Sequence, residues 1–183
     1  MKRILLSLAL ACITVFSYAQ KDLAVGIRFE VAEVEDNDDG YTIFKYKDQD
    51  GSIGYYLSLM HQTELLGIVL DNASSSLSHF NEVCLNMGAT SDDAIAFLDD
   101  LLELVGEDTG TTRDFEARLT NGAEFLTDSC TTTCYVKKGF LSGKYLDFVY
   151  EFKDRTQDVE LRKGAIKSLR STLKFNKKLH PDW

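Results

Sequence analysis

The feature that most constrains the fold is an alternation of apolar and polar residues, interrupted by short turns rich in Asp, Asn and Gly. One such run covers residues 23–31, and another covers 144–152 with bulky apolar residues on both of its faces. A period of two residues is typical of half-buried β-strands, and tight turns join strands antiparallel. The chain is therefore predicted to build an antiparallel sheet in which residues 144–152 lie centrally.

Turn signals divide the rest of the sheet. Asp50-Gly51 stands between two β-rich runs and predicts a hairpin, while Asn121-Gly122 and Leu141-Ser142-Gly143 mark further turns. The expected strands cover residues 23–31, 41–47, 52–59, 65–70, 113–119, a stretch after 122, 132–138 and 144–152.

Helical periodicity predicts three helices, over residues 77–87, 90–105 and about 157–175. In the second, Thr90 or Ser91 supplies the N-cap, and a clean apolar stripe lies opposite a row of acids. This order of elements predicts the α+β class. We expect a curved, mainly antiparallel sheet of about seven or eight strands, with two central helices and a C-terminal helix packed on it.

The first 19 residues have the composition of a secretory signal peptide. Lys2 and Arg3 precede an apolar run that is too short to span a bilayer, and small residues suit cleavage after Ala19. Residues 20–183 then form the exported chain, which is long enough for a single α+β domain with its own core. We predict a periplasmic or secreted protein with no transmembrane segment in the mature chain.

Cys12, inside the apolar run, is interpreted as a filler residue of the signal peptide. A lipoprotein cleavage box has a Leu-like residue three positions before its cysteine, where Ala9 stands here. Such a box also normally ends the apolar run, which here continues to Phe16. Lipidation at Cys12 is therefore not expected.

The charge of the chain is unevenly distributed. The formal net charge is −9, and cleavage after Ala19 would leave 18 basic against 29 acidic residues. A field of that sign repels phosphate backbones, so nucleic acid is not an expected partner. Residues 153–178, however, hold nine basic residues against three acids. We predict that this basic tail docks partly through charge on the acidic body of its own domain.

The exported chain would hold three cysteines, Cys84, Cys130 and Cys134. In an extended strand, Cys130 and Cys134 would lie about 13 Å apart, too far to bond. A loop or bulge at residues 131–133 would bring them together, and Cys84 could instead reach one of them. The interpretation adopted is a Cys130–Cys134 disulfide with Cys84 as a buried free thiol. No cofactor is expected.

The acidic turn over residues 35–40 is the weak candidate for a metal site. Glu35, Asn37 and Asp39 occupy the first, third and fifth positions of a calcium loop when Gly40 is aligned with its glycine. Tyr46 then stands at the twelfth position, where a bidentate carboxylate is required. Asp48 and Asp50 in the next turn could add oxygen ligands. The prediction is that this is a solvated turn and that no metal binds.

An enzymatic function depends on His61, which follows a strand and has Glu64 and Asp71 near it in sequence. The chain has no Gly-x-Ser-x-Gly elbow, no His-Glu-x-x-His motif and no phosphate-binding glycine loop. His61, His79 and His180 are therefore interpreted as surface residues. A small exported hydrolase that uses His61 with nearby carboxylates stays open as the first alternative function.

The strands are rich in aromatic residues, of which Tyr41, Tyr55 and Tyr145 are expected to reach the surface. Exposed rings on a sheet form a platform for sugars or for a partner protein. The leading prediction is a non-catalytic, exported binding module for a protein or glycan ligand. A second alternative is a membrane-surface-associated structural component that uses the basic C-terminal helix.

Overall fold

The computed structural model describes residues 26, 28–36, 39–61, 82–120, 125, 130–140, 143–152 and 155–180. The predicted signal peptide, the predicted strand 65–70 and nearly all of the stretch after Asn121-Gly122 lie outside these residues. The described elements are β1 (Arg28–Asp36), β2 (Asp39–Lys47), β3 (Ile53–His61), β4 (Glu82–Gly88), α3 (Ser91–Leu104), β5 (Thr112–Thr120), β6 (Cys130–Gly139), β7 (Gly143–Phe152), β8 (Arg155–Arg162) and α4 (Lys163–Leu179).

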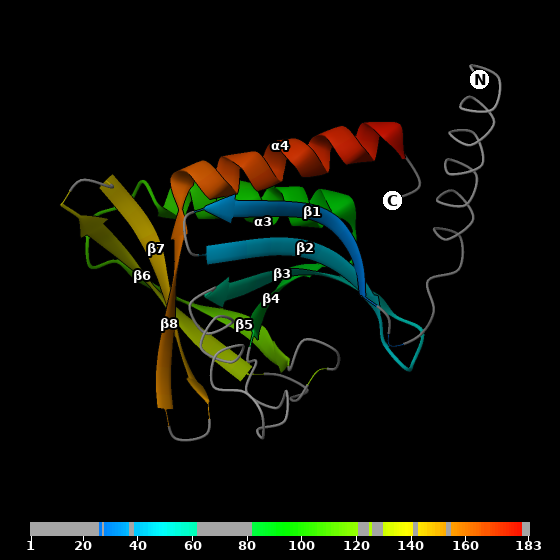
Figure 1. Ribbon diagram of the computed structural model, residues 1–183, viewed down its shortest axis with the longest axis horizontal. Coiled ribbons are helices and arrows are strands. Elements are labelled where there is room, and N and C mark those ends of the chain that lie inside the picture. The colour runs from blue at the N-terminus through cyan, green and yellow to red at the C-terminus, as the bar shows by residue number, and fades with distance from the viewer. Residues whose placement is uncertain are drawn as a thin grey trace, which may run out of the picture.

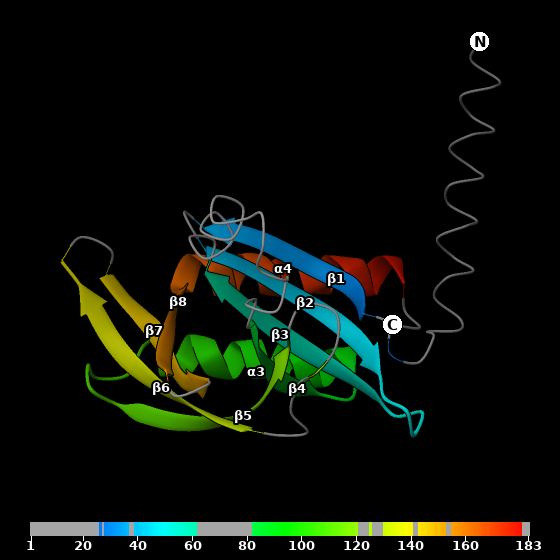
Figure 2. The same ribbon diagram turned by 60° about the horizontal axis from the view of Figure 1, so that its bottom comes forward.

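The eight strands form one sheet in chain order, and each is antiparallel to the next. The sheet curls into a half-barrel, so that β8 runs across the first strands and contacts β3 (Figures 1 and 2). The hydroxyl of Tyr41 on β2 donates to the carbonyl of Glu160 on β8 at 2.5 Å. As predicted, the strand with bulky residues on both faces, β7, lies between two others.

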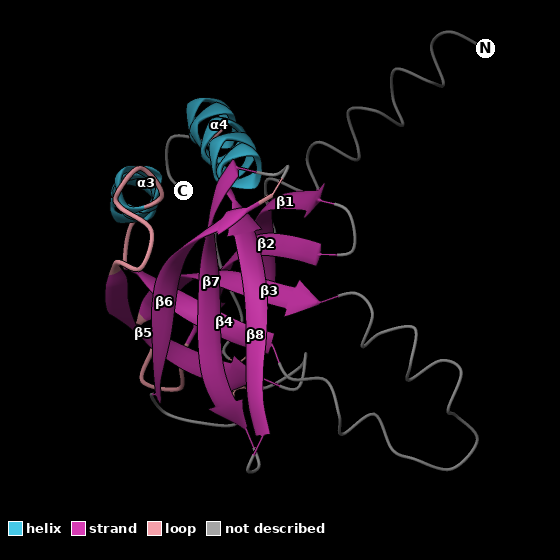
Figure 3. Cartoon of the chain, turned by 90° about the vertical axis from the view of Figure 1, so that its left-hand side faces the viewer, coloured by secondary structure: helices cyan, strands magenta, loops and turns pink. Residues whose placement is uncertain are grey.

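The core fills the concave side of the sheet and is closed by α3 and α4 (Figure 3). Alternate residues of every strand point into it: Tyr41 and Ile43 of β2 lie opposite Leu59 and Leu57 of β3, and all four are fully buried. Because each strand turns only one of its two faces toward the core, core-facing and outward-facing residues alternate along the sequence. The predicted α+β class is confirmed, and the main core lies on the concave side of the sheet.

Helix α3 begins where the sequence predicts. Thr90 is its N-cap: its hydroxyl accepts from the amide of Asp93 at 3.1 Å, and the Asp93 carboxylate accepts from the Thr90 amide at 2.9 Å. The Thr90 hydroxyl also donates to the Asp93 carboxylate at 2.6 Å, and this hydrogen bond, together with the one from the Thr90 amide, lowers the pKa of Asp93. Gly88, which ends β4, has a φ of +101°, and a Cβ there would lie 2.5 Å from the Cβ of Asp93. Glycine therefore permits the abrupt change from strand to helix.

Helix α4 docks on the domain through both packing and charge, as predicted. Its buried side chains are Ala165, Ile166, Leu169 and Leu173. Arg170 donates to Asp99 of α3 at 3.0 Å, and Lys177 pairs with Asp92. The side-chain amide of Asn176 donates to the carbonyl of Val31 on β1 at 2.7 Å. Neither described helix is long and apolar enough to cross a membrane.

The helix predicted over residues 77–87 is wrong where the structure describes it. Residues 82–88 form β4, in which Val83, Leu85 and Met87 face the core while Cys84 is buried on the opposite face. Because both faces of this strand are covered, it is apolar almost throughout. A short, continuously apolar segment matches helical spacing by chance as easily as strand alternation.

The closing helix begins later than predicted. Residues 155–162 form β8, and α4 starts at Lys163 rather than near Gln157. Val159 and Leu161 point into the core while Asp158 and Glu160 alternate with them on the other face. Val159 also lies at helical spacing from Ile166, so the helical pattern of the sequence continues into the residues that form β8. The described part of the chain therefore has one central helix and one C-terminal helix.

Candidate binding surface on the outer face of the sheet

The residues that alternate with the core positions lie on the outer face of the sheet. Pairing in register keeps opposite side chains on one face, so Phe44, Tyr56 and Arg118 share the outer face with Tyr135 and Asp147. Two groups of side chains occupy this face. The first, the arginine cluster, consists of Phe44, Tyr46, Asp48, Tyr56, Arg118 and Phe125. The second, the tyrosine–charge surface, consists of Tyr135, Lys137, Tyr145, Asp147, Glu160 and Arg162.

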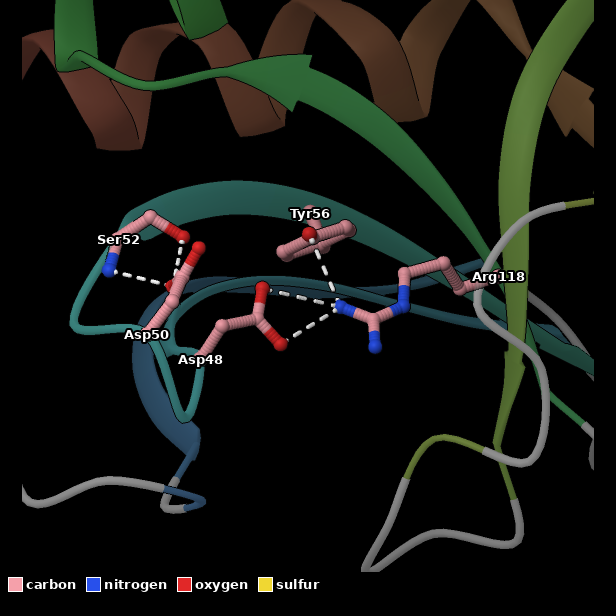
Figure 4. A network of polar contacts seen from close by, with 5 residues as sticks. All are labelled: Asp48, Asp50, Ser52, Tyr56 and Arg118. Carbon is pink, nitrogen blue, oxygen red and sulfur yellow. Dashed lines mark hydrogen bonds and ion pairs between the residues drawn. The ribbon is translucent and has the colours of Figure 1, made fainter.

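The arginine cluster is organised around the guanidinium of Arg118 on β5. Its Nη1 donates to both oxygens of Asp48, at 3.0 and 3.2 Å, and to the hydroxyl of Tyr56 at 3.4 Å (Figure 4). The guanidinium carbon lies 3.7 Å from the ring centre of Phe125. Burial lowers the pKa of Arg118, but the hydrogen bonds to Tyr56 and Asp48 outweigh it and leave the pKa above its usual value. The cation is therefore well compensated.

Aromatic rings surround this cation. Phe44 and Tyr56 stack with ring centres 5.6 Å apart, and Tyr46 meets Phe125 edge-on at 4.7 Å. Phe44 is fully buried although it points away from the main core. The cluster is therefore a second, smaller hydrophobic core with one ion pair at its rim. Such an arrangement stabilises the fold and leaves little surface for a ligand.

The tyrosine–charge surface covers the outer face of β6, β7 and β8. In register, Tyr135, Asp147 and Glu160 form one row across the three strands, and Lys137, Tyr145 and Arg162 form the adjacent row. Tyr135 is 36% exposed, whereas Asp147 beside it is only 1% exposed. The surface therefore combines an accessible ring with a carboxylate that its neighbours cover.

Two ion pairs hold the side chains of this surface. Lys137 Nζ lies 2.5 Å from Asp147 Oδ2, and Arg162 Nη2 lies 3.3 Å from Glu160 Oε2. The hydrogen bond that Lys137 donates to the Asp147 carboxylate raises the pKa of Lys137. Desolvation, with the nearby carboxylate of Glu160, raises the pKa of Tyr145. Both phenol and ammonium thus keep their protons at neutral pH, and the surface presents donors next to acceptors.

The three tyrosines predicted to reach the surface have different positions. Tyr41 and Tyr55 are fully buried on the core face, so that prediction is wrong for both. Burial raises the pKa of Tyr55 to about 12. Tyr145 is half-buried and belongs to the tyrosine–charge surface. Tyr135, which is not among the three tyrosines predicted to reach the surface, is the exposed ring of this surface. In the strand it alternates with Cys134 and Val136, which point into the core.

The structure brings none of the predicted metal ligands to a common described site. Glu35 and Asp39 lie in the β1–β2 hairpin, but their side chains are outside the described part of the structure. Asn37 lies outside the described residues altogether. Asp48 is bonded to Arg118, and Asp50 accepts from the amide and hydroxyl of Ser52 at 2.9 and 2.7 Å. Among the described side chains, no group of three potential ligands is arranged to hold a metal ion.

The predicted acid–base residues are not tested by the structure. His61 is the last residue of β3, but its side chain, like Glu64 and Asp71, lies outside the described residues. His79 lies outside them as well, and His180 follows the end of α4. A hydrolytic role for His61 therefore stays a prediction.

The predicted Cys130–Cys134 disulfide is wrong: Cys84, Cys130 and Cys134 are free thiols. Residues 130–135 pair with β5 in unbroken register, without the bulge that a bond would need. The two cysteines are four residues apart in a regular strand, which separates them by about 13 Å. Burial is the main cause that raises the pKa of Cys134, to about 12, so this thiol is unreactive at neutral pH.

Comparison with known proteins found no matching family model, no matching curated protein and no matching solved structure. The function must therefore be inferred from the geometry of this chain.

Proposed function

We propose that this chain is an exported, non-catalytic binding module that contacts a protein or glycan ligand through its tyrosine–charge surface. The observation that carries the proposal is the position of Tyr135, an accessible ring on the outer face of the sheet directly beside the buried Asp147. A partly exposed tyrosine supplies contact area at low entropic cost and a hydroxyl for hydrogen bonding.

The ion pairs around Tyr135 indicate that the surface is ordered before a ligand binds. Lys137 is held by Asp147 and Arg162 by Glu160, so neither cation has to be ordered when a ligand binds. The concave side of the sheet offers no comparable surface among the described residues, because its aromatic side chains pack with α3 and α4 in the core. A ligand is therefore expected on the outer face, where side chains are fixed by their neighbours.

The experiment that tests the proposal starts with a glycan array and with photo-crosslinking of exported proteins from the same cell. The crosslinking group is placed at position 135 in one sample and at position 140 in another. Phe140 is fully exposed at the end of β6 but is not part of the tyrosine–charge surface, so it provides a matched control. We expect a ligand that crosslinks from position 135 only.

Affinity for that ligand then gives the decisive comparison. Tyr135→Ser is expected to weaken binding at least tenfold, about 1.4 kcal/mol, because one central aromatic contact is removed. Phe140→Ser should leave binding unchanged. Binding that survives Tyr135→Ser but is lost on Phe140→Ser would overturn the assignment of the surface. Chemical conversion of the bound ligand that disappears on His61→Ala would support the hydrolase instead.

A further inference from the structure

Helix α4 has an outer side that the domain does not cover. Phe175 and Leu179 are 61% and 57% exposed, and residues spaced by four lie next to one another on a helix. The buried stripe of α4 is formed by other residues, from Ala165 to Leu173. The exposed pair is therefore an apolar patch that the core does not require.

A row of lysines borders this patch. Lys163, Lys167, Lys174 and Lys178 are separated by four and seven residues, so they follow one side of the helix beside Phe175. The helix contains no acidic residue. Its outer side thus combines a strip of positive charge with an apolar pair near the C-terminal end.

The other cations of α4 are compensated within the domain. Arg170 bonds to Asp99, and Lys177 pairs with Asp92, both on α3. These two residues explain how the helix docks on its own acidic domain, and that docking does not need the lysine row. The positive strip on the outer side is therefore separate from the contacts that hold the helix in place.

We propose that the outer side of α4 docks this protein on an anionic lipid surface, with Phe175 and Leu179 at the level of the headgroups. Lysines beside an apolar strip are the arrangement by which interfacial helices bind anionic bilayers, since the ammonium groups meet phosphates while the apolar side chains leave water. The apolar pair favours lipid over an acidic protein or nucleic acid, for which lysines alone would suffice.

The orientation of the molecule fits this docking. The C-terminal end of α4 and the strands β6 and β7 lie at opposite ends of the molecule (Figure 1). The apolar pair of the proposed docking surface is therefore remote from β6 and β7. The inference itself rests on α4 alone and does not depend on the ligand of the sheet face.

Vesicle co-sedimentation tests the inference with the protein as its own cell processes and exports it. The probes are vesicles of phosphatidylcholine alone and of equal parts phosphatidylcholine and phosphatidylglycerol. We expect binding to the anionic vesicles at low salt and its loss at high salt, because the attraction is screened. Lys167→Gln, Lys174→Gln and Lys178→Gln together should weaken binding about a hundredfold, at roughly fivefold for each lysine.

Matched variants separate this surface from nonspecific attraction. Phe175→Ser should also weaken binding, whereas Lys138→Gln with Phe140→Ser, an exposed cation and ring at the other end of the molecule, should not. Circular dichroism and thermal unfolding verify that each variant is folded. Absence of binding to anionic vesicles, unchanged binding by the triple lysine variant, or salt-sensitive binding to polyglutamate but not to vesicles would each overturn the inference.

Discussion

The outer face of the sheet is used in two different ways in its two halves. On β2–β5, Phe44 and Tyr56 are buried beneath further side chains, with Phe125 packed against them. On β6–β8, Tyr135 lies on the same face and is exposed. The side chains point outward in both halves, so strand alternation does not explain the difference. The difference arises from the side chains that pack over each half.

The ion pairs are also arranged differently in the two halves. In the arginine cluster, the cation of Arg118 lies against aromatic rings and its partner Asp48 is at the rim. In the tyrosine–charge surface, the carboxylate of Asp147 is buried and its partner Lys137 reaches solvent. The first arrangement ties a strand to a turn. The second leaves a polar, structured surface facing water.

The largest expected effect contrasts the two rings. Phe44→Ala should reduce the free energy of unfolding by about 3–5 kcal/mol, because it empties a fully buried aromatic site. Tyr135→Ala should change it by no more than about 0.5 kcal/mol, since surface substitutions cost little. Urea unfolding of both variants measures the difference. Equal losses would show that the two halves are packed alike.

Arg118→Lys is expected to cost about 1–2 kcal/mol. The ammonium keeps the charge opposite Asp48 but loses the flat contact with Phe125. Urea unfolding again provides the measurement, with Lys138→Arg as a control at an exposed lysine. A loss no larger than that of the control would mean that the ring contact contributes nothing.

Lys137→Met should cost about 1 kcal/mol, because it leaves the buried Asp147 carboxylate without its cation. The effect is smaller than for a fully buried pair, since half of the lysine side chain is exposed to water. Adding Asp147→Asn should recover most of the loss in a double-mutant cycle. Additive losses would instead show that the two side chains do not interact.

Raising the pH is expected to have no effect near neutrality and to destabilise the protein at alkaline pH. The pKa values of Cys134 and Tyr55 are both about 12 in the folded chain, above their ordinary values. The unfolded chain therefore loses these protons first, and stability falls as the pH rises through about 9 to 12. Thiol titration checks the assignment: the half-buried Cys130 should react with a disulfide reagent before Cys134. Equal rates would contradict the burial.

Local sequence signals predicted the structure correctly where that structure does not depend on contacts between distant segments. The N-cap signal at Thr90 or Ser91 predicted the start of α3, and Asp50-Gly51 predicted a hairpin in which Lys47 lies opposite Ile53. Gly51 has the positive φ that such a turn requires. The charge of the C-terminal helix also predicted its docking on acidic residues. Each of these features is determined within a few residues or by net charge.

Other predictions failed because burial depends on the whole fold. Residues 82–88 have apolar side chains on both faces, so their period could not distinguish strand from helix. Tyr41 and Tyr55 alternate in their strands as Tyr145 does, and the sequence contains no sign of which face each one occupies. Export, the ligand and the role of His61 stay predictions.

The sequence by itself determined an antiparallel α+β domain, a capped central helix and a basic C-terminal helix, because periodicity, caps and charge act over short distances. Only the tertiary structure decided that the sheet curls until β3 meets β8, that Phe44 is buried and that Tyr135 is exposed. Those outcomes depend on which segments, remote in sequence, cover each face of a strand. Burial is a property of that packing, and no single strand encodes it.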